Sequence, residues 1–280
     1  MIPSDFDYAV AGSVDEAIGM LADGGGDAKL LAGGHSLLPL MKLRFASPSL
    51  LVDIGRIDEL RGIDTGDDSF RIGALTRHAD LQVRDDMGLI AAAAKQIADQ
   101  QVRNRGTIGG SLVNGDSAAD LPGVLMALEG SVTVRSADGE RVIEAADLFQ
   151  GYLSTAVAPG EVLTEVRVPA LAGYGWGYEK FNRRSEDWAM VGVSALVKAS
   201  GGVCEDVRIG LTHMAATPLR ASPSEDALRG KPLTEENIEA AAQLAAEGTS
   251  PLGDLNASPD YKRHLARVLT KRALTTASAA

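Results

Sequence analysis

The chain has 280 residues, of which 45% are hydrophobic and 23% charged, so it can bury one large core or two smaller ones. Its net charge of −11 argues against a nucleic-acid groove or an anionic membrane surface as partner. Cys204 is the only cysteine, which excludes an internal disulfide, an iron–sulfur cluster and a cysteine-rich zinc site and favours the reducing cytoplasm.

We expect neither a signal peptide nor a transmembrane segment, because no apolar stretch reaches the about 20 residues that span a bilayer. The four histidines are scattered without metal-ligand spacing. We therefore expect them at surface or loop positions and expect no metal site.

The first 56 residues predict a small βαβ unit. Ser13 and Glu16 have the spacing of a capping box, which predicts a helix that ends at the glycines of residues 24–26. The unit itself consists of a buried strand, a helix and a second strand, over residues 29–32, 37–44 and 50–54.

The rest of the chain predicts an α+β protein. Between residues 57 and 172 we expect strands over 60–64, 70–75, 131–135, 141–143 and 161–168, a short helix capped by Thr76, and helices over 89–100 and 121–128. After a boundary near residues 171–175, the pattern predicts an antiparallel sheet with helices: strands over 177–182, 189–198 and 203–214, and helices over 224–228, 235–246 and 259–275.

Two glycine-containing segments are the most informative features. Residues 29–40 read Lys-Leu-Leu-Ala-Gly-Gly-His-Ser-Leu-Leu-Pro-Leu, an apolar strand that runs through glycines into a helix. Residues 105–116 form a second glycine turn. Such segments expose backbone N–H groups near the positive end of a helix dipole, which suits a diphosphate. Glycine pairs alone decide nothing, because five occur where about 3.4 are expected by chance. Turns without a ligand therefore remain an alternative.

Familiar nucleotide and nucleophile motifs are absent from the sequence. Neither G-x-G-x-x-G nor G-x-x-x-x-G-K-[ST] occurs. Ser36 does not lie in a nucleophile elbow, because Leu38 stands where the second glycine is required.

At these two segments the chain resembles the flavin-binding medium subunits of the molybdenum hydroxylase superfamily, most of all those of aerobic, molybdenum-containing carbon monoxide dehydrogenases. The resemblance covers almost the whole chain. Its signatures are Ile2-Pro3 with Phe6-Asp7-Tyr8, Ala32-Gly33-Gly34-His35-Ser36-Leu37, Ile97-Ala98-Asp99, Gly106-Thr107-Ile108-Gly109-Gly110, Asn114-Gly115-Asp116, Ala119-Asp120, Tyr178-Glu179-Lys180 and Ile209-Gly210-Leu211-Thr212.

The resemblance implies a two-subdomain FAD-binding domain of p-cresol methylhydroxylase type over residues 1–172, divided near residues 56 and 57, and a carboxy-terminal flavoprotein domain over residues 173–280. It also implies a complex, organised as a dimer of heterotrimers. A [2Fe-2S] small subunit would pass electrons to FAD from a large subunit that holds the molybdenum cofactor, and an external acceptor would take them on. The location would be the cytoplasm or the inner face of the membrane.

The resemblance further implies which residues contact FAD, and it implies no catalytic side chain. The segment from residue 29 to residue 37 would surround the pyrophosphate and the neighbouring ribityl chain, and the second segment would supply further donors. Asp120 would accept a hydrogen bond from a sugar hydroxyl, and Lys180 would approach the polar edge of the ring. The full set is Lys29, Leu30, Leu31, Ala32, Gly33, Gly34, His35, Ser36, Leu37, Ile97, Ala98, Thr107, Ile108, Gly109, Gly110, Ser111, Asn114, Asp116, Asp120, Leu163, Lys180 and Trp188.

Several alternatives stay open. Without the resemblance, Glu179 and Lys180 would be interpreted as an exposed pair on a strand, and Tyr8 and Tyr178 as packing residues. The chain could also be a stand-alone flavin oxidoreductase, or a structural module whose glycines serve only turns. Carbon monoxide is the first expectation for the substrate of the complex, with aldehydes, purines and N-heterocycles as alternatives, and the acceptor is undetermined.

Overall fold

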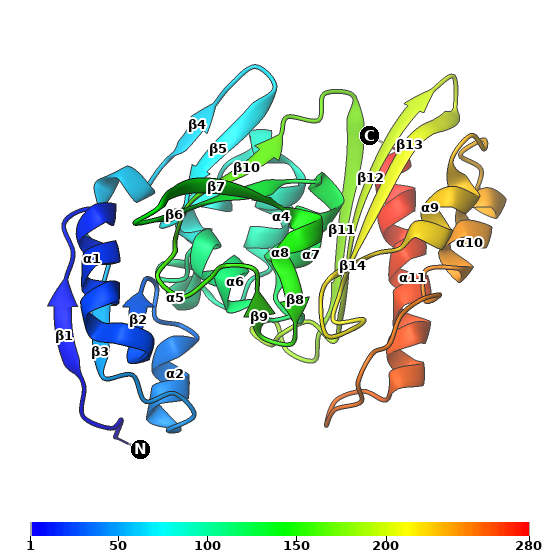
Figure 1. Cartoon of the computed structure of the whole chain (residues 1–280). Coiled ribbons are helices and arrows are strands. Elements are labelled where there is room, and N and C mark those ends of the chain that lie inside the picture. The colour runs from blue at the N-terminus through cyan, green and yellow to red at the C-terminus, as the bar shows by residue number, and fades with distance from the viewer. Residues whose placement is uncertain (1, 280) are drawn as a thin grey trace.

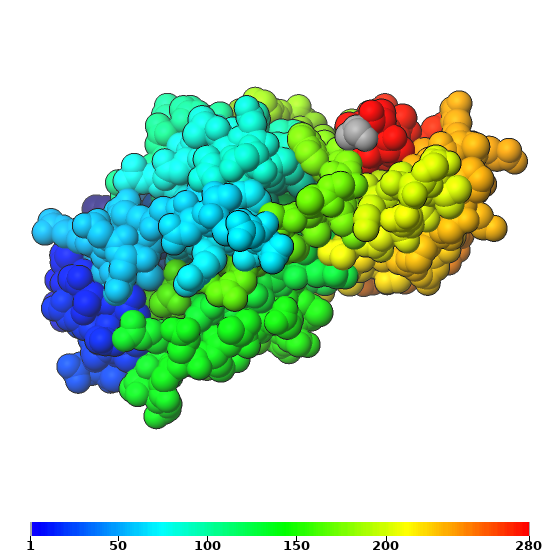
Figure 2. Space-filling view, turned by 90° about the horizontal axis from the view of Figure 1, so that it is seen from above, coloured from blue at the N-terminus to red at the C-terminus, as the bar shows by residue number. Residues whose placement is uncertain are grey.

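The computed structural model describes residues 2–279, which form an elongated molecule (Figure 1). Figure 2 shows the N-terminal, middle and C-terminal parts of the chain in a row along its long axis. Each part contains a main β-sheet, and three hydrophobic clusters make up the core. Within residues 2–279, no helix is both long enough and apolar enough to cross a membrane.

The first part confirms the predicted βαβ unit, since β2 and β3 pair in parallel with α2 between them. An unpredicted strand, β1, pairs with the other side of β3. At the start of α1, Ser13 Oγ accepts from the Glu16 amide at 3.1 Å, while the Glu16 carboxylate accepts from the Gly12 amide at 2.7 Å. The elements are β1 (Asp7–Val10), α1 (Val14–Gly24), η1 (Gly25–Asp27), β2 (Ala28–Leu31), α2 (Leu37–Lys42) and β3 (Leu50–Asp53).

The middle part is built on an antiparallel sheet with the strand order β4-β5-β10-β6-β7, packed against helices in the largest hydrophobic cluster. Its elements are η2 (Asp58–Leu60), β4 (Ile63–Thr65), β5 (Ser69–Gly73), α3 (His78–Leu81), η3 (Asp85–Met87), α4 (Leu89–Lys95), α5 (Gln100–Arg103), α6 (Ile108–Asn114), α7 (Asp120–Leu128), β6 (Ser131–Ser136), β7 (Gly139–Glu144), α8 (Ala145–Leu148), β8 (Phe149–Gly151), β9 (Ser154–Thr155) and β10 (Val162–Pro169).

Three local predictions in this part are wrong. The alanine-rich helix expected over residues 89–100 ends at Lys95, because the chain turns sharply at Ala98 (φ 41°) before α5 begins. The second glycine segment is mostly helix α6 rather than a turn, with Thr107 as the N-cap that accepts from the Gly110 amide. The short helix α3 is preceded by Arg77, not capped by Thr76, whose hydroxyl donates to the Gly62 carbonyl.

The third part is an antiparallel sheet of order β11-β12-β13-β14 with three helices after it, as predicted. One face of this sheet packs against the last helix, where Leu265, Leu269 and Ala273 are buried. The elements are β11 (Tyr174–Phe181), β12 (Val191–Ser200), β13 (Val203–Thr212), β14 (Leu219–Arg220), α9 (Ser222–Leu228), α10 (Glu235–Gln243) and α11 (Pro259–Ser278).

Helix α7 of the middle part covers the opposite face of the third sheet. The two backbones touch at glycines: a Cβ added at Gly210 would lie 2.0 Å from the Gly123 oxygen, and one added at Gly123 would lie 2.4 Å from Thr212 Oγ1. Glycine at both positions therefore lets the helix approach the sheet closely enough to join the second and third parts.

We expect Gly210→Ala to destabilise the protein by about 3 kcal/mol, because no side chain can give way where the added methyl group meets backbone. Gly19→Ala is the control. Gly19 lies in α1 with nothing within 4 Å of its added Cβ, so the change should stabilise by about 0.5–1 kcal/mol. Urea denaturation measures both, and equal stabilities would contradict the close contact.

Candidate cofactor-binding site

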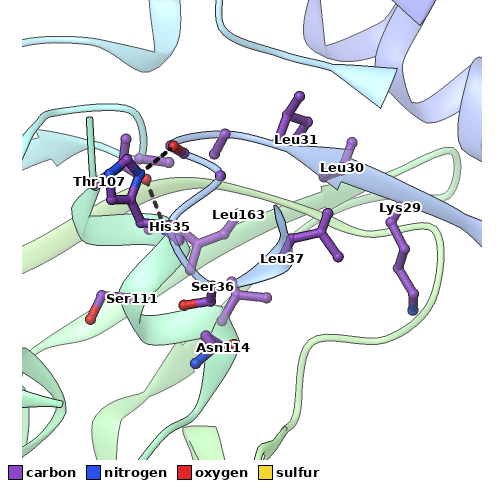
Figure 3. A pocket seen from close by; sticks show the side chains of 18 of the residues that line it. Lys29, Leu30, Leu31, His35, Ser36, Leu37, Thr107, Ser111, Asn114 and Leu163 are labelled. Atoms are coloured by element: carbon purple, nitrogen blue, oxygen red, sulfur yellow. Dashed lines mark hydrogen bonds between the residues drawn. The ribbon is translucent and has the colours of Figure 1, made fainter. Parts of the chain in front are cut away.

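A cavity of about 810 Å³ lies where the three parts of the molecule meet. The β2–α2 segment forms one wall, and α6 with the start of β10 forms another (Figure 3). The third part contributes Lys180 and the connection between β11 and β12. The cavity contains 20 of the 22 residues expected to contact FAD: Lys29, Leu30, Leu31, Ala32, Gly33, Gly34, His35, Ser36, Leu37, Ile97, Ala98, Thr107, Gly109, Gly110, Ser111, Asn114, Asp120, Leu163, Lys180 and Trp188.

The other two expected residues, Ile108 and Asp116, do not line the cavity. Ile108 is the first residue of α6, is 2% exposed and packs into the core. The other side of this helix faces the cavity. The Asp116 carboxylate instead accepts from the Ala118 amide at 2.9 Å and stabilises the turn between α6 and α7.

The first glycine segment lines the cavity and carries a row of unpaired backbone donors. Among residues 2–279, the amides of Gly33, Gly34, His35, Ser36 and Leu37 find no hydrogen-bond partner. Gly34 has φ 75°, which suits glycine, and His35 Nδ1 lies 2.9 Å from the Gly33 oxygen and holds the loop. Five consecutive unpaired amides favour an anionic ligand at this position.

Gly33 also brings the two glycine segments together. A Cβ added there would lie 2.3 Å from the Arg105 oxygen and 2.9 Å from Gly106 Cα. At Gly109, an added Cβ would lie 2.8 Å from the Ala74 oxygen, so this glycine lets α6 pack against the end of β5. Gly33 and Gly109 therefore let the two walls of the cavity approach the backbone of Arg105 and of Ala74 closely.

The second segment offers fewer backbone donors than we expected. The amides of Ile108 and Gly109 donate to Thr76 and Ala74 oxygens, at 3.0 and 2.9 Å. Those of Gly110 and Ser111 donate to the Thr107 hydroxyl and carbonyl, as the first turn of a capped helix. The expectation that residues 107–111 supply backbone and hydroxyl donors to a cofactor therefore stays a prediction. The side chains of Ser111 and Asn114 also reach the cavity (Figure 3).

Asp120, Tyr178 and Lys180 form a buried cluster at the cavity wall. Lys180 Nζ lies 3.0 Å from Asp120 Oδ2 and 2.9 Å from the Gln96 oxygen, and the Tyr178 hydroxyl donates to the other Asp120 oxygen. The Lys180 side chain is 1% exposed and that of Asp120 4%, so the interpretation as a surface pair is wrong. Tyr178 is not merely a packing residue either, because it binds this carboxylate.

Burial raises the pKa of the Asp120 carboxyl, against the opposing charge of Lys180. Burial and the neighbouring Asp120 also raise the pKa of Tyr178 well above 10.0, so its hydroxyl stays protonated and donates. The cluster joins α7 to β11 and places the Lys180 ammonium, paired with the Asp120 carboxylate, at the cavity.

The break between α4 and α5 shapes another part of the wall. Arg103 donates to the Ile97 oxygen at 2.7 Å and to the Ala98 oxygen at 2.8 Å, while Lys180 binds the Gln96 oxygen. These bonds stabilise the left-handed conformation at Ala98, which costs energy for a residue other than glycine. Ile97 and Ala98 thereby reach the cavity as predicted.

His78 is a cavity residue that we expected at the surface. It is 5% exposed, and its Nδ1 atom has no hydrogen-bond partner in the described chain. Burial lowers its pKa to about 4, so the imidazole is neutral at pH 7. The available signal in the sequence was its position shortly after a predicted strand, in the same half of the chain as the two glycine segments. The loop of residues 157–162 and the side chains of Glu186 and Asp187 also line the cavity without having been predicted.

Residues 2–279 contain no group of three or more histidine, cysteine, aspartate or glutamate side chains that could hold a metal ion.

His78 should make the protein less stable in acid. In the unfolded chain its imidazole takes up a proton near pH 6.5, but in the folded protein only near pH 4. The unfolded state therefore binds more protons between these values, and stability falls as the pH drops through that window. We expect this group to account for about 2–3 kcal/mol of the stability lost between pH 7 and pH 4.5.

Urea denaturation of His78→Gln at both pH values checks this expectation. The variant should lose less stability on acidification than the wild type. An equal loss would contradict a neutral, buried imidazole.

The chain matches known families over nearly its whole length. Residues 4–171 match the family described as FAD binding domain in molybdopterin dehydrogenase, and residues 176–277 match the CO dehydrogenase flavoprotein C-terminal domain. The carbon monoxide dehydrogenase medium chain of Hydrogenophaga pseudoflava is 45% identical, with 99% of this chain and 98% of that protein covered. The 6-hydroxypseudooxynicotine dehydrogenase complex subunit alpha of Paenarthrobacter nicotinovorans is 41% identical, with 99% and 96% covered.

A solved structure of carbon monoxide dehydrogenase from Hydrogenophaga pseudoflava, which lacks the Mo-pyranopterin moiety of the molybdenum cofactor, has a similar fold. The TM-score is 0.97 at 47% sequence identity, with 100% of this chain and 99% of that chain covered. The chain therefore belongs to the FAD-binding medium subunits of the molybdenum hydroxylases and is an oxidoreductase subunit whose cofactor is FAD.

Proposed function

We propose that this chain is the electron-transfer subunit of a cytoplasmic molybdenum hydroxylase complex. Its partners would be a [2Fe-2S] small subunit and a molybdenum-binding large subunit, in a dimer of heterotrimers, with an external electron acceptor. The observation that carries the proposal is the row of five unpaired amides at Gly33–Leu37, which faces a cavity shared by all three parts of a chain in this family. We also propose the division into domains at residues 172 and 173.

The cavity residues fit FAD. The unpaired amides and the glycine contact at Gly33 suit the diphosphate, and each hydrogen bond to such a charged group contributes about 1.5–3 kcal/mol. Because the donors are local, they outweigh the screened repulsion of a chain with net charge −11. Ser111 and Asn114 would bind polar groups of the cofactor, and Asp120 a sugar hydroxyl.

Around the ring system, we propose apolar contacts from Ile97, Ala98, Leu163 and Trp188, with Lys180 at the polar edge. When bound, FAD supplies the redox chemistry, which amino-acid side chains do not provide. The residues of this chain bind and orient it and limit its contact with water. We assign no side chain to proton transfer, and His78 is neutral at pH 7.

We propose carbon monoxide as the substrate of the complex, supported by the 45% identity to the medium chain of a carbon monoxide dehydrogenase. The 41% identity to a subunit of a 6-hydroxypseudooxynicotine dehydrogenase is nearly as high. Medium subunits with this degree of sequence identity can belong to complexes that act on different substrates. An aldehyde, a purine or an N-heterocycle is therefore the alternative. Mass spectrometry of the purified native complex, followed by assays with each substrate class, identifies the partner chains and decides between them.

Gly33→Ala tests the cofactor site itself. The added methyl group would meet the Arg105 oxygen and push the amide-bearing segment out of position. Loss of about two hydrogen bonds to a charged group, at about 1.5–3 kcal/mol each, should weaken FAD binding at least 100-fold. Gly19→Ala, on an exposed face of α1 away from the cavity, is the matched control and should bind as the wild type does.

Flavin fluorescence titration measures these affinities, and the loaded wild type should absorb near 450 nm, as flavins do. A wild-type protein that stays colourless with added FAD would overturn the assignment of the cavity. Wild-type affinity in Gly33→Ala would contradict the role of the amide row.

A further inference from the structure

Lys262 of α11 is a fully buried lysine, and its ammonium group has three acceptors. Its Nζ lies 2.7 Å from Asp254 Oδ2, 2.9 Å from the Leu252 oxygen and 3.2 Å from His213 Nε2. A buried ammonium is expensive unless each of its donors is used. Two of the acceptors belong to the loop before α11, but the third, His213, directly follows β13, next to the middle part of the molecule.

His213 connects three segments. Its backbone, at φ 64°, donates from its amide to the Ser117 oxygen at 2.7 Å. Its ring Nδ1 lies 2.7 Å from the Ala189 oxygen. Because a carbonyl oxygen only accepts, Nδ1 carries the proton, and Nε2 is left to accept from Lys262. Lys262 therefore stabilises the tautomer and ring orientation that bind Ala189.

Ala189 follows three consecutive residues of the cavity wall, Glu186, Asp187 and Trp188. These belong to the connection between β11 and β12. Within it, the Asp187 amide donates to the Arg184 oxygen at 3.1 Å, and the Ser185 hydroxyl lies 3.1 Å from Glu186 Oε2. Asn182 Nδ2 lies 3.3 Å from the Ser185 oxygen and 3.5 Å from the Asp187 oxygen. The bonds that tie this connection to neighbouring segments lie at its base: the Met190 amide donates to the Phe181 oxygen at 2.8 Å, and His213 binds Ala189.

We propose that Lys262 is a positioning residue for the cofactor site: acting through His213, it holds residues 183–188, and Trp188 with them, against the cavity. The proposal rests on the proposed function in so far as FAD occupies that cavity. Trp188 is 56% exposed, so little of the protein packs against its indole, and the base of the connection determines where the indole lies.

The test uses the full chain loaded with FAD, in a Trp176→Phe background that leaves Trp188 as the only tryptophan. Flavin absorbs at the wavelengths where tryptophan emits, so Trp188 emission reports its distance from the flavin. In Lys262→Met, we expect stronger Trp188 emission and about tenfold faster FAD dissociation, which corresponds to about 1.4 kcal/mol of lost positioning. Lys271→Met, on the same helix at a lysine paired with Glu235 and Glu239 at the surface, should leave both unchanged.

A second pair of variants keeps the test decisive if Lys262→Met does not fold. Asn and Gly both tolerate the left-handed backbone at position 213, but only the Asn amide can still donate to the Ala189 oxygen. His213→Gly should therefore behave as Lys262→Met does, and His213→Asn should keep Trp188 close to the flavin. If His213 had a purely structural role, His213→Gly and His213→Asn would both have a lower melting temperature, but they would not differ in Trp188 emission or in FAD dissociation.

Trypsin cleavage without FAD distinguishes the two proposals. Arg183 and Arg184 are exposed cleavage sites within the positioned segment, and they should be cut faster in Lys262→Met and His213→Gly than in the wild type. If the wild type takes up no FAD, the proposed function fails, while the cleavage rates still test the positioning. Wild-type rates of both cleavage and FAD release in these variants, or the same changes in Lys271→Met, would overturn the role of Lys262.

Discussion

The contact between Gly123 of α7 and Gly210 of β13 determines how the two halves of the chain are joined. A Cβ at Gly210 would lie only 2.0 Å from the Gly123 oxygen, so no side chain fits there. The backbones of the helix and the sheet are therefore in direct contact. That approach leaves Asp120, the first residue of α7, beside Tyr178 and Lys180 of β11. The cavity wall therefore depends on packing by Gly123 and Gly210, which do not themselves line the cavity. Without α7, residues 173–280 would leave one face of their sheet exposed.

Several hydrogen-bond donors line the cavity, beside the acidic residues Asp120, Glu161, Glu186 and Asp187. The amides of residues 33–37, the Lys180 ammonium and the Ser111 hydroxyl can bind an anionic, oxygen-rich molecule, although the chain as a whole is acidic. The buried carboxylate of Asp120 is already shared between Tyr178 and Lys180. Such a site binds and orients a cofactor and leaves the chemistry to it. The structure thus agrees with the family to which the chain belongs.

Local patterns predicted much of the fold because they depend on neighbours in the sequence. The βαβ unit, the long strands of the third part and the helix that starts at Pro259 follow from periodicity and caps. The break after Lys95 could not be predicted in this way, because its bonds come from Arg103 and from Lys180, which lies 84 residues from its acceptor Gln96. Likewise, an alternating strand pattern gave no sign that Lys180 is buried.

The sequence by itself determined that a strand, two glycines and a helix follow one another at residues 29–42, since these preferences are local. It also carried the motifs by which the family is identified. Only the tertiary structure decided which amides remain unpaired. In the first segment no acceptor within the described residues 2–279 binds the amides of residues 33–37, whereas in the second Thr76 and Ala74 accept from Ile108 and Gly109. The physical reason is that a backbone amide binds whichever acceptor the fold brings to it, and those acceptors are distant in sequence.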